Sequence, residues 1–478
     1  MAIDLISSAV GGRVVSCNDE FFAEASNLLN PAEPVWKEHE YTDRGKWMDG
    51  WESRRRREPG HDWCVIALGI PGRIDEVIVD TSHFTGNYPE QFSLDACGVG
   101  SDELIDHAEW TEVIARTSLE GDSQARFEPD LPGRVTHVRL NIFPDGGVAR
   151  LRVGGTPIPQ MSQVCRDGPV DLASLIVGGE AVDASDSFFS PPANMIRPTD
   201  PAGMWDGWET KRRRGPGHDW AVFRLGLAGV VDRVLVDTRF FKGNSPGWVS
   251  LHTSDDGESW EEVITRHAVE PDTVNGITLD PPVAASYLKL DIIPDGGVAR
   301  FRALGTANSE SALARRLEYL NALLPQPLNH FLTTACAASK WAETMAASRP
   351  FPSVDEVLAR AEEAFADLGE SDWLDAFGGH PRIGERTGDA LATAEQSGAR
   401  DAEGAVLEEL ERVNREYEER FGFTYIVYAT GKGADEMMKI ARERLTNTRE
   451  QEIENAAVEQ RKITATRLRK MLCQEVDG

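Results

Sequence analysis

The sequence predicts a multidomain protein in which two all-β jelly-roll sandwiches precede an all-α helical domain. Three observations lead to this prediction: a long internal repeat, strand-like alternation inside each copy, and an abrupt change of composition near Thr306. The length of 478 residues agrees with about three domains of roughly 150 residues each. We therefore expect domains at residues 1–160, 161–307 and 308–478.

The internal repeat is long and keeps its order. The block MDGWESRRRREPGHDW (Met48–Trp63) returns as WDGWETKRRRGPGHDW (Trp205–Trp220), and NIFPDGGVARLRVGGT (Asn141–Thr156) returns as DIIPDGGVARFRALGT (Asp291–Thr306). Each copy spans about 150 residues, which is the size of a domain with its own core. The repeat therefore indicates a duplicated domain and not a short-period solenoid.

The two parts of the chain differ in the period of their apolar residues. Val138 and Leu140 belong to a strand-like alternation, and turn sequences such as PDGG separate several such runs, which is typical of a β-sandwich. After residue 307 the spacing becomes helical, and Ser353 with Glu356 forms a capping-box pattern at one helix start. The segment Phe423–Ala429 is apolar and β-branched, which predicts either a strand or an extended buried segment.

The chain is strongly acidic. Lys and Arg number 50 against 79 Asp and Glu, a formal net charge of −29 at pH 7. Such a charge repels polyphosphates and anionic lipids, so we expect no nucleic acid and no membrane as partner. The chain does not open with a secretion signal, which favours a cytoplasmic protein. The six scattered cysteines form no CxxC pair, which indicates reduced thiols and neither a disulfide scaffold nor a zinc ribbon.

The DGWE…RRR…PGHDW block brings acids, arginines and a histidine together twice. Guanidinium groups bind carboxylates and a histidine transfers protons near neutral pH, so the block predicts a site for a small anionic substrate. The candidate residues are Asp49, Glu52, Arg55, His61 and Asp62, with Asp206, Glu209, Arg212, His218 and Asp219 in the second copy. Alternatively, the block is structural, with its charges solvated. A divalent metal also stays open, although the spacing lacks an HxH or HxxxH pattern.

The doubled DGWE…RRR…GHDW, VDT…F.GN and PDGGVAR…G blocks resemble allantoicase over residues 1–307. The resemblance implies tandem galactose-binding-like jelly rolls that hydrolyse allantoate to ureidoglycolate and urea. The alternative is a pair of non-catalytic ligand-binding modules, because TSDDGESW (Thr253–Trp260) resembles a turn of discoidin-like carbohydrate-binding domains. The copies differ at three aligned positions. His83, Tyr88 and Glu90 of the first copy correspond to Phe240, Ser245 and Gly247 of the second. Two sites, if both exist, need not be equivalent.

The helical part carries GGHPRIGER, TAEQSG, ERFGFTYIVYA, RLTNTREQE and KITATRLRKML in this order. Together they resemble 2-oxo-4-hydroxy-4-carboxy-5-ureidoimidazoline (OHCU) decarboxylase over about residues 309–473. The resemblance implies formation of (S)-allantoin without a cofactor. By position, His380 matches the acid/base histidine, Glu395 the glutamate of the EQ pair, and Arg467 the arginine that holds the substrate.

The same resemblance implies a set of substrate-lining residues. They are Pro381, Gln396, Tyr425, Ile426, Val427, Tyr428 and Ala429. One departure is Ala392, where the family usually has serine, and Thr393 is then the candidate for that hydroxyl. The alternative for this domain is an inactive helical scaffold that oligomerises the hydrolase.

The combined prediction is a bifunctional enzyme of purine catabolism, a hydrolase joined to a lyase. We expect small anionic ureides as its substrates and a homo-oligomer as its assembly. We expect no cofactor for the decarboxylase, and for the allantoicase the need for a metal stays open.

Overall fold

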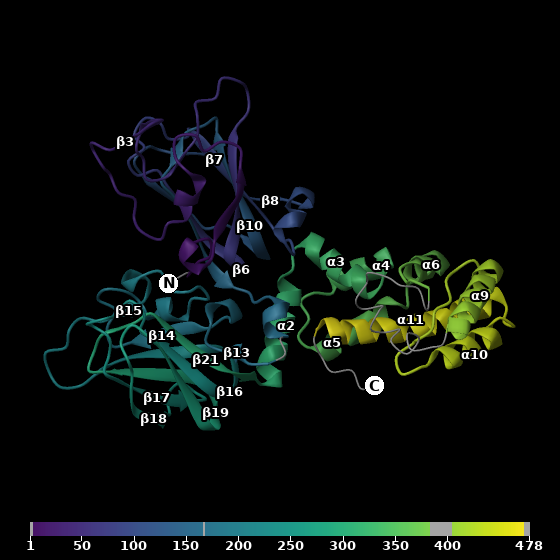
Figure 1. Cartoon of the computed structure of the whole chain (residues 1–478). Helices are drawn as coiled ribbons and strands as arrows, with labels where there is room; N and C mark the ends of the chain where they lie inside the picture. Colours follow the sequence, from purple (N-terminus) through teal and green to yellow (C-terminus); the bar gives the residue numbers. More distant parts are fainter. Residues whose placement is uncertain (1–2, 166–167, 383–403, 473–478) are drawn as a thin grey trace. The chain divides into compact units, whose positions relative to one another are not determined.

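The computed structural model describes residues 3–165, 168–382 and 404–472 (Figure 1). The chain divides into two compact units, Met1–Leu324 and Pro325–Gly478. The first unit is built from β-sheets and the second from helices, so the predicted fold class is confirmed.

The first repeat forms an eight-stranded antiparallel sheet in the order β1-β12-β6-β10-β7-β8, with β2 and β9 also paired to β6. Its strands are β1 (Ile3–Asp4), β2 (Arg13–Cys17), β6 (Asp62–Asp80), β7 (Gln91–Cys97), β8 (Thr111–Ser118), β9 (Gln124–Phe127), β10 (Leu131–Phe143) and β12 (Arg150–Pro157). Two short two-stranded sheets are also present. In one, β3 (Tyr41–Thr42) pairs with β4 (Gly45–Lys46), and in the other, β5 (Trp51–Glu52) pairs with β11 (Gly147–Val148). Three 3₁₀ helices intervene: η1 (Ser8–Val10), η2 (Ala25–Leu29) and η3 (Asp102–His107).

The second repeat follows the same plan with seven strands in the order β13-β21-β16-β19-β17-β18, and β14 paired to β16. Its strands are β13 (Val170–Asp171), β14 (Glu180–Ala184), β16 (Asp219–Asp237), β17 (Trp248–Ser254), β18 (Glu261–Ala268), β19 (Val274–Ile293) and β21 (Arg300–Ala307), with the short pair β15 (Trp208–Glu209) and β20 (Gly297–Val298). The helices are α1 (Met161–Val164), η4 (Leu175–Val177), η5 (Pro192–Ile196) and η6 (Met204–Asp206).

Strand β6 explains why distant motifs meet. Its first residue, Asp62, lies opposite Ile142 at the end of β10, and its last residue, Asp80, lies opposite Arg150 at the start of β12. Because only a short connection separates the end of β10 from the start of β12, both ends of β6 reach the same rim of the sandwich. The predicted alternation is confirmed in β10, where Leu140 is fully buried and the neighbouring Arg139 faces outward.

The paired glycines of PDGG serve close packing at this rim. A Cβ on Gly147 would lie 2.0 Å from Cε1 of Phe84, and one on Gly297 would lie 2.0 Å from Cε1 of Phe241. Both phenylalanines are fully buried. Only glycine therefore lets the backbone pass over these rings.

The two repeats share one continuous hydrophobic cluster, in which buried residues of both sandwiches are in contact. Helix α2 (Ser309–Ala322) joins this unit: Arg315 Nε donates to the Gly226 carbonyl at 3.0 Å, and the Arg134 guanidinium lies 5.2 Å from the Tyr319 ring. The helix thus contacts both repeats. The compact-unit division falls after α2, whereas the sequence prediction places the domain boundary at residue 308, before it.

The second unit contains α3 (Pro325–Ala335), α4 (Ser339–Ala347), α5 (Val354–Ala364), α6 (Glu370–Gly378), α9 (Gly404–Phe421), α10 (Ala434–Arg444) and α11 (Arg449–Met471). The predicted cap of α5 is present, since Ser353 Oγ accepts from the Glu356 amide at 3.1 Å. Residues 423–429 form no strand but an extended, largely buried segment, which decides between the two alternatives. Arg444 Nη1 holds it by donating to the Ile426 carbonyl at 2.8 Å.

Among the helices of the described residues, none has the length and apolar character needed to cross a bilayer. Cys17, Cys64, Cys97 and Cys336 are free thiols, as expected. Cys165 is disulfide-bonded, so the expectation of reduced thiols is wrong at this position. The spacing of the cysteines in the sequence does not predict a disulfide at Cys165, because they are scattered and form no CxxC pair.

Candidate functional site

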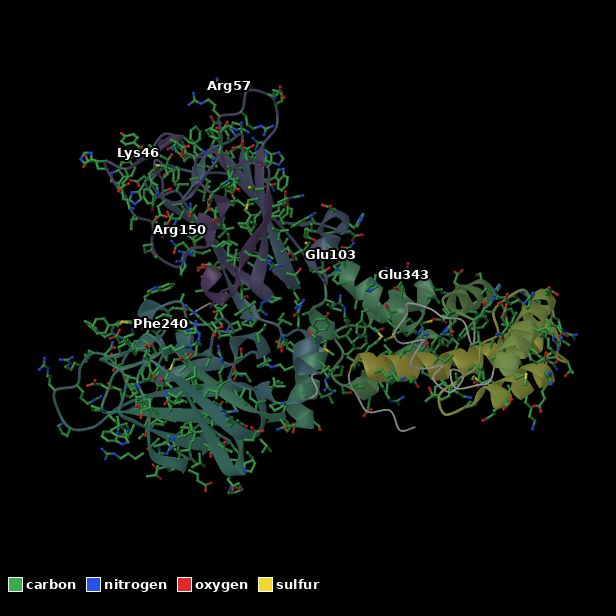
Figure 2. The ribbon with its side chains drawn as sticks, in the orientation of Figure 1. Lys46, Arg57, Glu103, Arg150, Phe240 and Glu343 are labelled. Atoms are coloured by element: carbon green, nitrogen blue, oxygen red, sulfur yellow. The ribbon has the colours of Figure 1, made fainter. Side chains whose placement is uncertain are left out.

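The candidate acids of the first repeat lie at the rim where β6 begins and ends. Asp49 is held there by Arg150, whose Nη2 donates to Asp49 Oδ2 at 2.8 Å and whose Nη1 donates to its carbonyl at 3.1 Å (Figure 2 labels Arg150). Arg150 is only 1% exposed. The second repeat repeats the pair, with Arg300 Nη2 donating to Asp206 Oδ2 at 2.6 Å. Both aspartates therefore anchor buried arginines and fix the rim.

These two arginines were not among the sequence candidates. The signal was present in the repeated PDGGVAR block, whose last residue is Arg150 in one copy and Arg300 in the other. A charged residue in an apolar strand start, repeated at the same place, indicates a buried ion pair.

Glu52, a further candidate acid at this rim, has an altered proton affinity. Asn87 Nδ2 donates to Glu52 Oε1 at 2.8 Å, and in the second repeat Asn244 donates to Glu209 at 2.6 Å. Burial raises the pKa of the Glu52 carboxyl, while the hydrogen bond from Asn87 acts in the opposite direction. Glu52 is therefore suited to exchange a proton closer to neutral pH than an exposed glutamate.

The arginine run divides into anchored and exposed members. Arg56 Nη1 donates to Asp62 Oδ1 at 2.6 Å, and its amide donates to Asp145 Oδ2 at 2.9 Å. Arg55 and its counterpart Arg212 are exposed. The neighbouring Arg57 lies on an outer loop of the first sandwich (Figure 2). Arg55 thus faces solvent beside the rim, where a soluble anion can reach it.

The second repeat divides its run in the same way. Arg213 forms an ion pair with Asp219, and its amide donates to Asp295 Oδ2 at 2.6 Å. Asp62 and Asp219 are almost completely buried. These two aspartates therefore act on arginine side chains of their own loops.

His61 does not join the acids of the rim. Its ring lies against Phe143 with centroids 4.7 Å apart, and it lines a cavity on the outer face of the sheet. His218 instead places Nε2 at 3.1 Å from Asp291 Oδ2. His61 and Asp62 therefore point to different sides, as adjacent residues of an extended chain do, and the same holds for His218 and Asp219 in the second repeat. That histidine and aspartate serve one catalytic site stays a prediction.

A histidine that the motif analysis did not select lies at the rim of the first repeat. His83 has φ +70°, its amide donates to Asp122 Oδ1 at 2.8 Å, and its ring lies 5.9 Å from the Trp36 ring. The amide of Val35, next to Trp36, donates to Asp49 Oδ2 at 2.9 Å, which brings this loop to the rim. Phe240, the counterpart of His83, is labelled in Figure 2 and has φ +73°. Only the first repeat has an imidazole at this strained position.

The TSDDGESW turn between β17 and β18 is satisfied by its own atoms. Asp256 Oδ1 accepts from the amides of Glu258 and Ser259, each at 2.8 Å. Such a pattern is that of a hairpin turn.

In the helical unit His380 and Arg467 come together. His380 follows the end of α6, and Arg467 lies on α11 with its Nη2 at 3.4 Å from His380 Nδ1. His380 Nε2 lies 2.8 Å from Oε1 of Gln460, which is completely buried. Gln460 Nε2 donates in turn to Thr464 Oγ1 at 3.2 Å. Sequence reasoning missed Gln460, because a glutamine inside a helix forms no motif.

The other predicted residues of this site divide into described and undescribed ones. Pro381 is half-buried beside His380, and the Tyr428 amide donates to Glu459 Oε2 at 2.7 Å. Tyr425 donates its hydroxyl to the Met437 carbonyl at 3.1 Å, so the segment to Ala429 is held in place. Glu395 and Gln396, with Ala392 and Thr393, lie outside the described residues.

Within the described ranges, no group of three or more His, Cys, Asp and Glu side chains is arranged to hold a metal ion.

Comparisons with known proteins match both parts. The family model for the allantoicase repeat matches residues 3–158 and 170–308, and the model for OHCU decarboxylase matches residues 321–469. A probable allantoicase from Photobacterium profundum is 41% identical over 316 residues, covering 63% of this chain and 96% of that protein. The crystal structure of allantoicase from Saccharomyces cerevisiae is 35% identical, with a TM-score of 0.55, over 64% of this chain and 93% of that one.

A crystal structure of OHCU decarboxylase determined in the presence of (S)-allantoin is also similar. Its identity is 33% and its TM-score 0.28, over 30% of this chain and 97% of that one.

Proposed function

We propose that the chain catalyses the reactions of both families that its parts match. It belongs to the allantoicase family and also carries an OHCU decarboxylase domain. It is therefore an enzyme fusion of purine catabolism. The first reaction is hydrolysis of allantoate to ureidoglycolate and urea. The second is decarboxylation of OHCU to (S)-allantoin. The observation that carries the proposal is the match of each family to a separate part of the chain.

The hydrolytic site is proposed at the rim of the first repeat, around Glu52. Hydrolysis must activate water and protonate the departing urea nitrogen, and a carboxyl with a raised pKa can serve either step. Asn87 orients Glu52 through its 2.8 Å hydrogen bond. Arg55, exposed on the adjacent loop, is proposed to bind the substrate carboxylate.

The two rims are proposed to be unequal. The first has His83 and the loop of Trp36, whereas the second has Phe240 in place of the histidine. The test compares Glu52→Gln with its repeat counterpart Glu209→Gln in urea release from allantoate. We expect a loss of about 10²- to 10⁴-fold for Glu52→Gln, the usual range for a proton-transfer group, and a much smaller loss for Glu209→Gln. Equal rates in both variants and the wild type would exclude these glutamates.

In the helical unit, His380 is proposed to deliver the proton that forms the new C–H bond of (S)-allantoin. The bond between ring carbon C4 and its carboxyl group breaks and CO2 leaves, while the electron pair moves into the adjoining C5=N bond, whose nitrogen takes up a proton. The proton from His380 then adds to C5, the carbon that bears the ureido group, as the C4 hydroxyl loses its proton and becomes a carbonyl. This chemistry needs no cofactor. Arg467, 3.4 Å from His380, is proposed to hold the anionic substrate against the imidazole.

Gln460 is proposed to position His380. Since Gln460 Nε2 donates to Thr464, its Oε1 is left to accept from His380 Nε2–H. This assigns the proton of the neutral imidazole to Nε2 and makes Nδ1, on the side of Arg467, the basic nitrogen.

The decarboxylase proposal is tested with freshly generated OHCU and optical detection of the product. His380→Asn should give nearly racemic allantoin, because the intermediate then decays without the enzyme, while urea release from allantoate stays unchanged. Undiminished (S)-allantoin from the variant would remove His380 from the mechanism. Loss of both activities would indicate a damaged fold.

The remaining expectations are tested in the same preparation. A pair of non-catalytic binding modules would release no urea from allantoate. Urea release with and without a chelator tests for a divalent metal, and light scattering of the full chain tests the expected homo-oligomer.

A further inference from the structure

The outer face of the first sheet is hollowed into a cavity of about 660 Å³ that the proposed reactions do not use. Its floor consists of outward-facing residues of β6, β7 and β10. Arg139 lies opposite Asp95 on the neighbouring strand, and Asn141 lies opposite Trp63. Between them Leu140 faces the core and is fully buried. The floor is therefore a polar face of the sheet and no part of the hydrophobic core.

One wall of the cavity is formed by a chain segment that is longer in the first repeat than in the second. Asp95 matches His252 and Trp110 matches Trp260, so the segment between is seven residues longer in the first repeat (110 − 95 = 15 against 260 − 252 = 8). This extra segment contains η3, on which Glu103 is labelled in Figure 2, and it ends at Trp110 in the cavity wall. The Trp110 ring lies 4.6 Å from the Arg139 guanidinium.

The polar groups of the floor are fixed before any ligand arrives. Asp95 Oδ2 accepts from Arg139 Nε at 3.0 Å, from Arg139 Nη2 at 2.8 Å and from Asn141 Nδ2 at 2.9 Å. Asn141 also donates to Ser93 Oγ at 3.1 Å. A carboxylate and a guanidinium side by side offer an acceptor next to a donor, with no net charge. This pattern complements an edge on which N–H and C=O alternate.

The second repeat has a different arrangement on the same face. Asp291 stands in place of Asn141, and its Oδ2 lies 2.9 Å from His252 Nε2 and 3.1 Å from His218 Nε2. Lys289, in place of Arg139, lies 3.5 Å from Asp291 Oδ1. The charged groups there bind one another.

We propose that the cavity of the first repeat binds a small, neutral, cyclic ureide as a second site, separate from the hydrolytic rim. Its flat ring would stack on Trp63 and Trp110, and its N–H and C=O edge would meet Asp95 and Arg139. The volume lies within the range of about 300–1,000 Å³ of small-ligand sites. The proposed function enters only in the choice of (S)-allantoin as one probe, because that ring is the product assigned to the helical unit.

The test is calorimetric titration of the full chain with hydantoin, the unsubstituted ring, and with (S)-allantoin. Both should bind saturably. Arg139→Gln and Trp110→Ala should each weaken binding by roughly 10- to 100-fold, the effect of losing one charge-assisted or stacking contact. Lys289→Gln, the counterpart of Arg139 in the second repeat, is the control and should bind both probes as the wild type does.

Three results would overturn the proposal. The first is no binding of either ring by the wild-type chain, or binding that both cavity variants retain. The second is preferential binding of a neutral hexose such as galactose, which would assign the cavity to sugars. The third is a fall in urea release parallel to the loss of hydantoin binding, which would make the cavity the hydrolytic site. Failure of the proposed function is separate, since a chain that releases no urea can still be titrated with hydantoin.

Discussion

Replacing Gln460 tests whether a buried amide controls the proton on His380. The Gln460→Leu variant keeps the side-chain volume close to that of glutamine but removes the acceptor that lies 2.8 Å from His380 Nε2. Gln460 is fully buried, so the imidazole N–H loses its partner without replacement by bulk water. The hydrogen bond holds the imidazole in its reactive orientation, and its loss at a cost of about 1–3 kcal/mol lets the ring turn away, which corresponds to roughly 5- to 150-fold in kcat for (S)-allantoin formation.

The Gln460→Glu variant changes the charge and retains the shape. A carboxylate beside His380 favours the imidazolium and raises the pKa of the histidine, so the pH dependence of decarboxylation should move to higher pH. Glu454→Gln, on an exposed part of the same helix, is the control and should leave rate and pH profile unchanged.

The assay is initial-rate formation of (S)-allantoin between pH 5 and 9, with the melting temperature of each variant measured in parallel. A purely structural role would lower the melting temperature of Gln460→Leu and leave the pH profile of the Glu variant like that of the wild type. That result would refute the positioning role.

The other predictions concern the β-sandwich unit. Asp206→Asn should lower the free energy of unfolding by about 3–5 kcal/mol in urea denaturation, because Arg300 remains charged and only 2% exposed. Gly147→Ala should destabilise by about 1–3 kcal/mol in the same measurement, because the new methyl group would overlap Phe84; wild-type stability would show that the ring moves freely. If ionised Glu52 is the base, its raised pKa means that urea release falls, as the pH is lowered, at a higher pH than for an exposed glutamate; a profile without that acidic limb would contradict the role.

The fold class was predictable because its signals are local and occur twice. The period of two in β10 and the helical period after residue 307 report burial directly, since each apolar residue faces the core. The boundary was less predictable. Helix α2 has the composition of the helical part, but its contacts, such as Arg315 with the Gly226 carbonyl, lie on the sandwiches.

The candidate site was predicted less well, because closeness in sequence is a poor measure of closeness in space. His61 and Asp62 are neighbours in the motif, yet one lines the outer cavity and the other is buried with Arg56. Gln460 and His380 are 80 positions apart and in contact. His83 carried a usable signal, since it is a point at which two otherwise similar copies diverge.

Because of helix α2, the boundary between the two parts lies at a different residue in the sequence than in the structure. The composition changes at residue 308, whereas the compact units divide after Leu324. The helix follows the last strand of the second repeat and contacts both repeats. Its Arg315 donates to the Gly226 carbonyl of one, and its Tyr319 ring lies against Arg134 of the other. A cut at residue 308 would therefore detach α2 from the sandwiches that it contacts. A cut between Leu324 and Pro325 follows the division into compact units and keeps α2 with the two repeats.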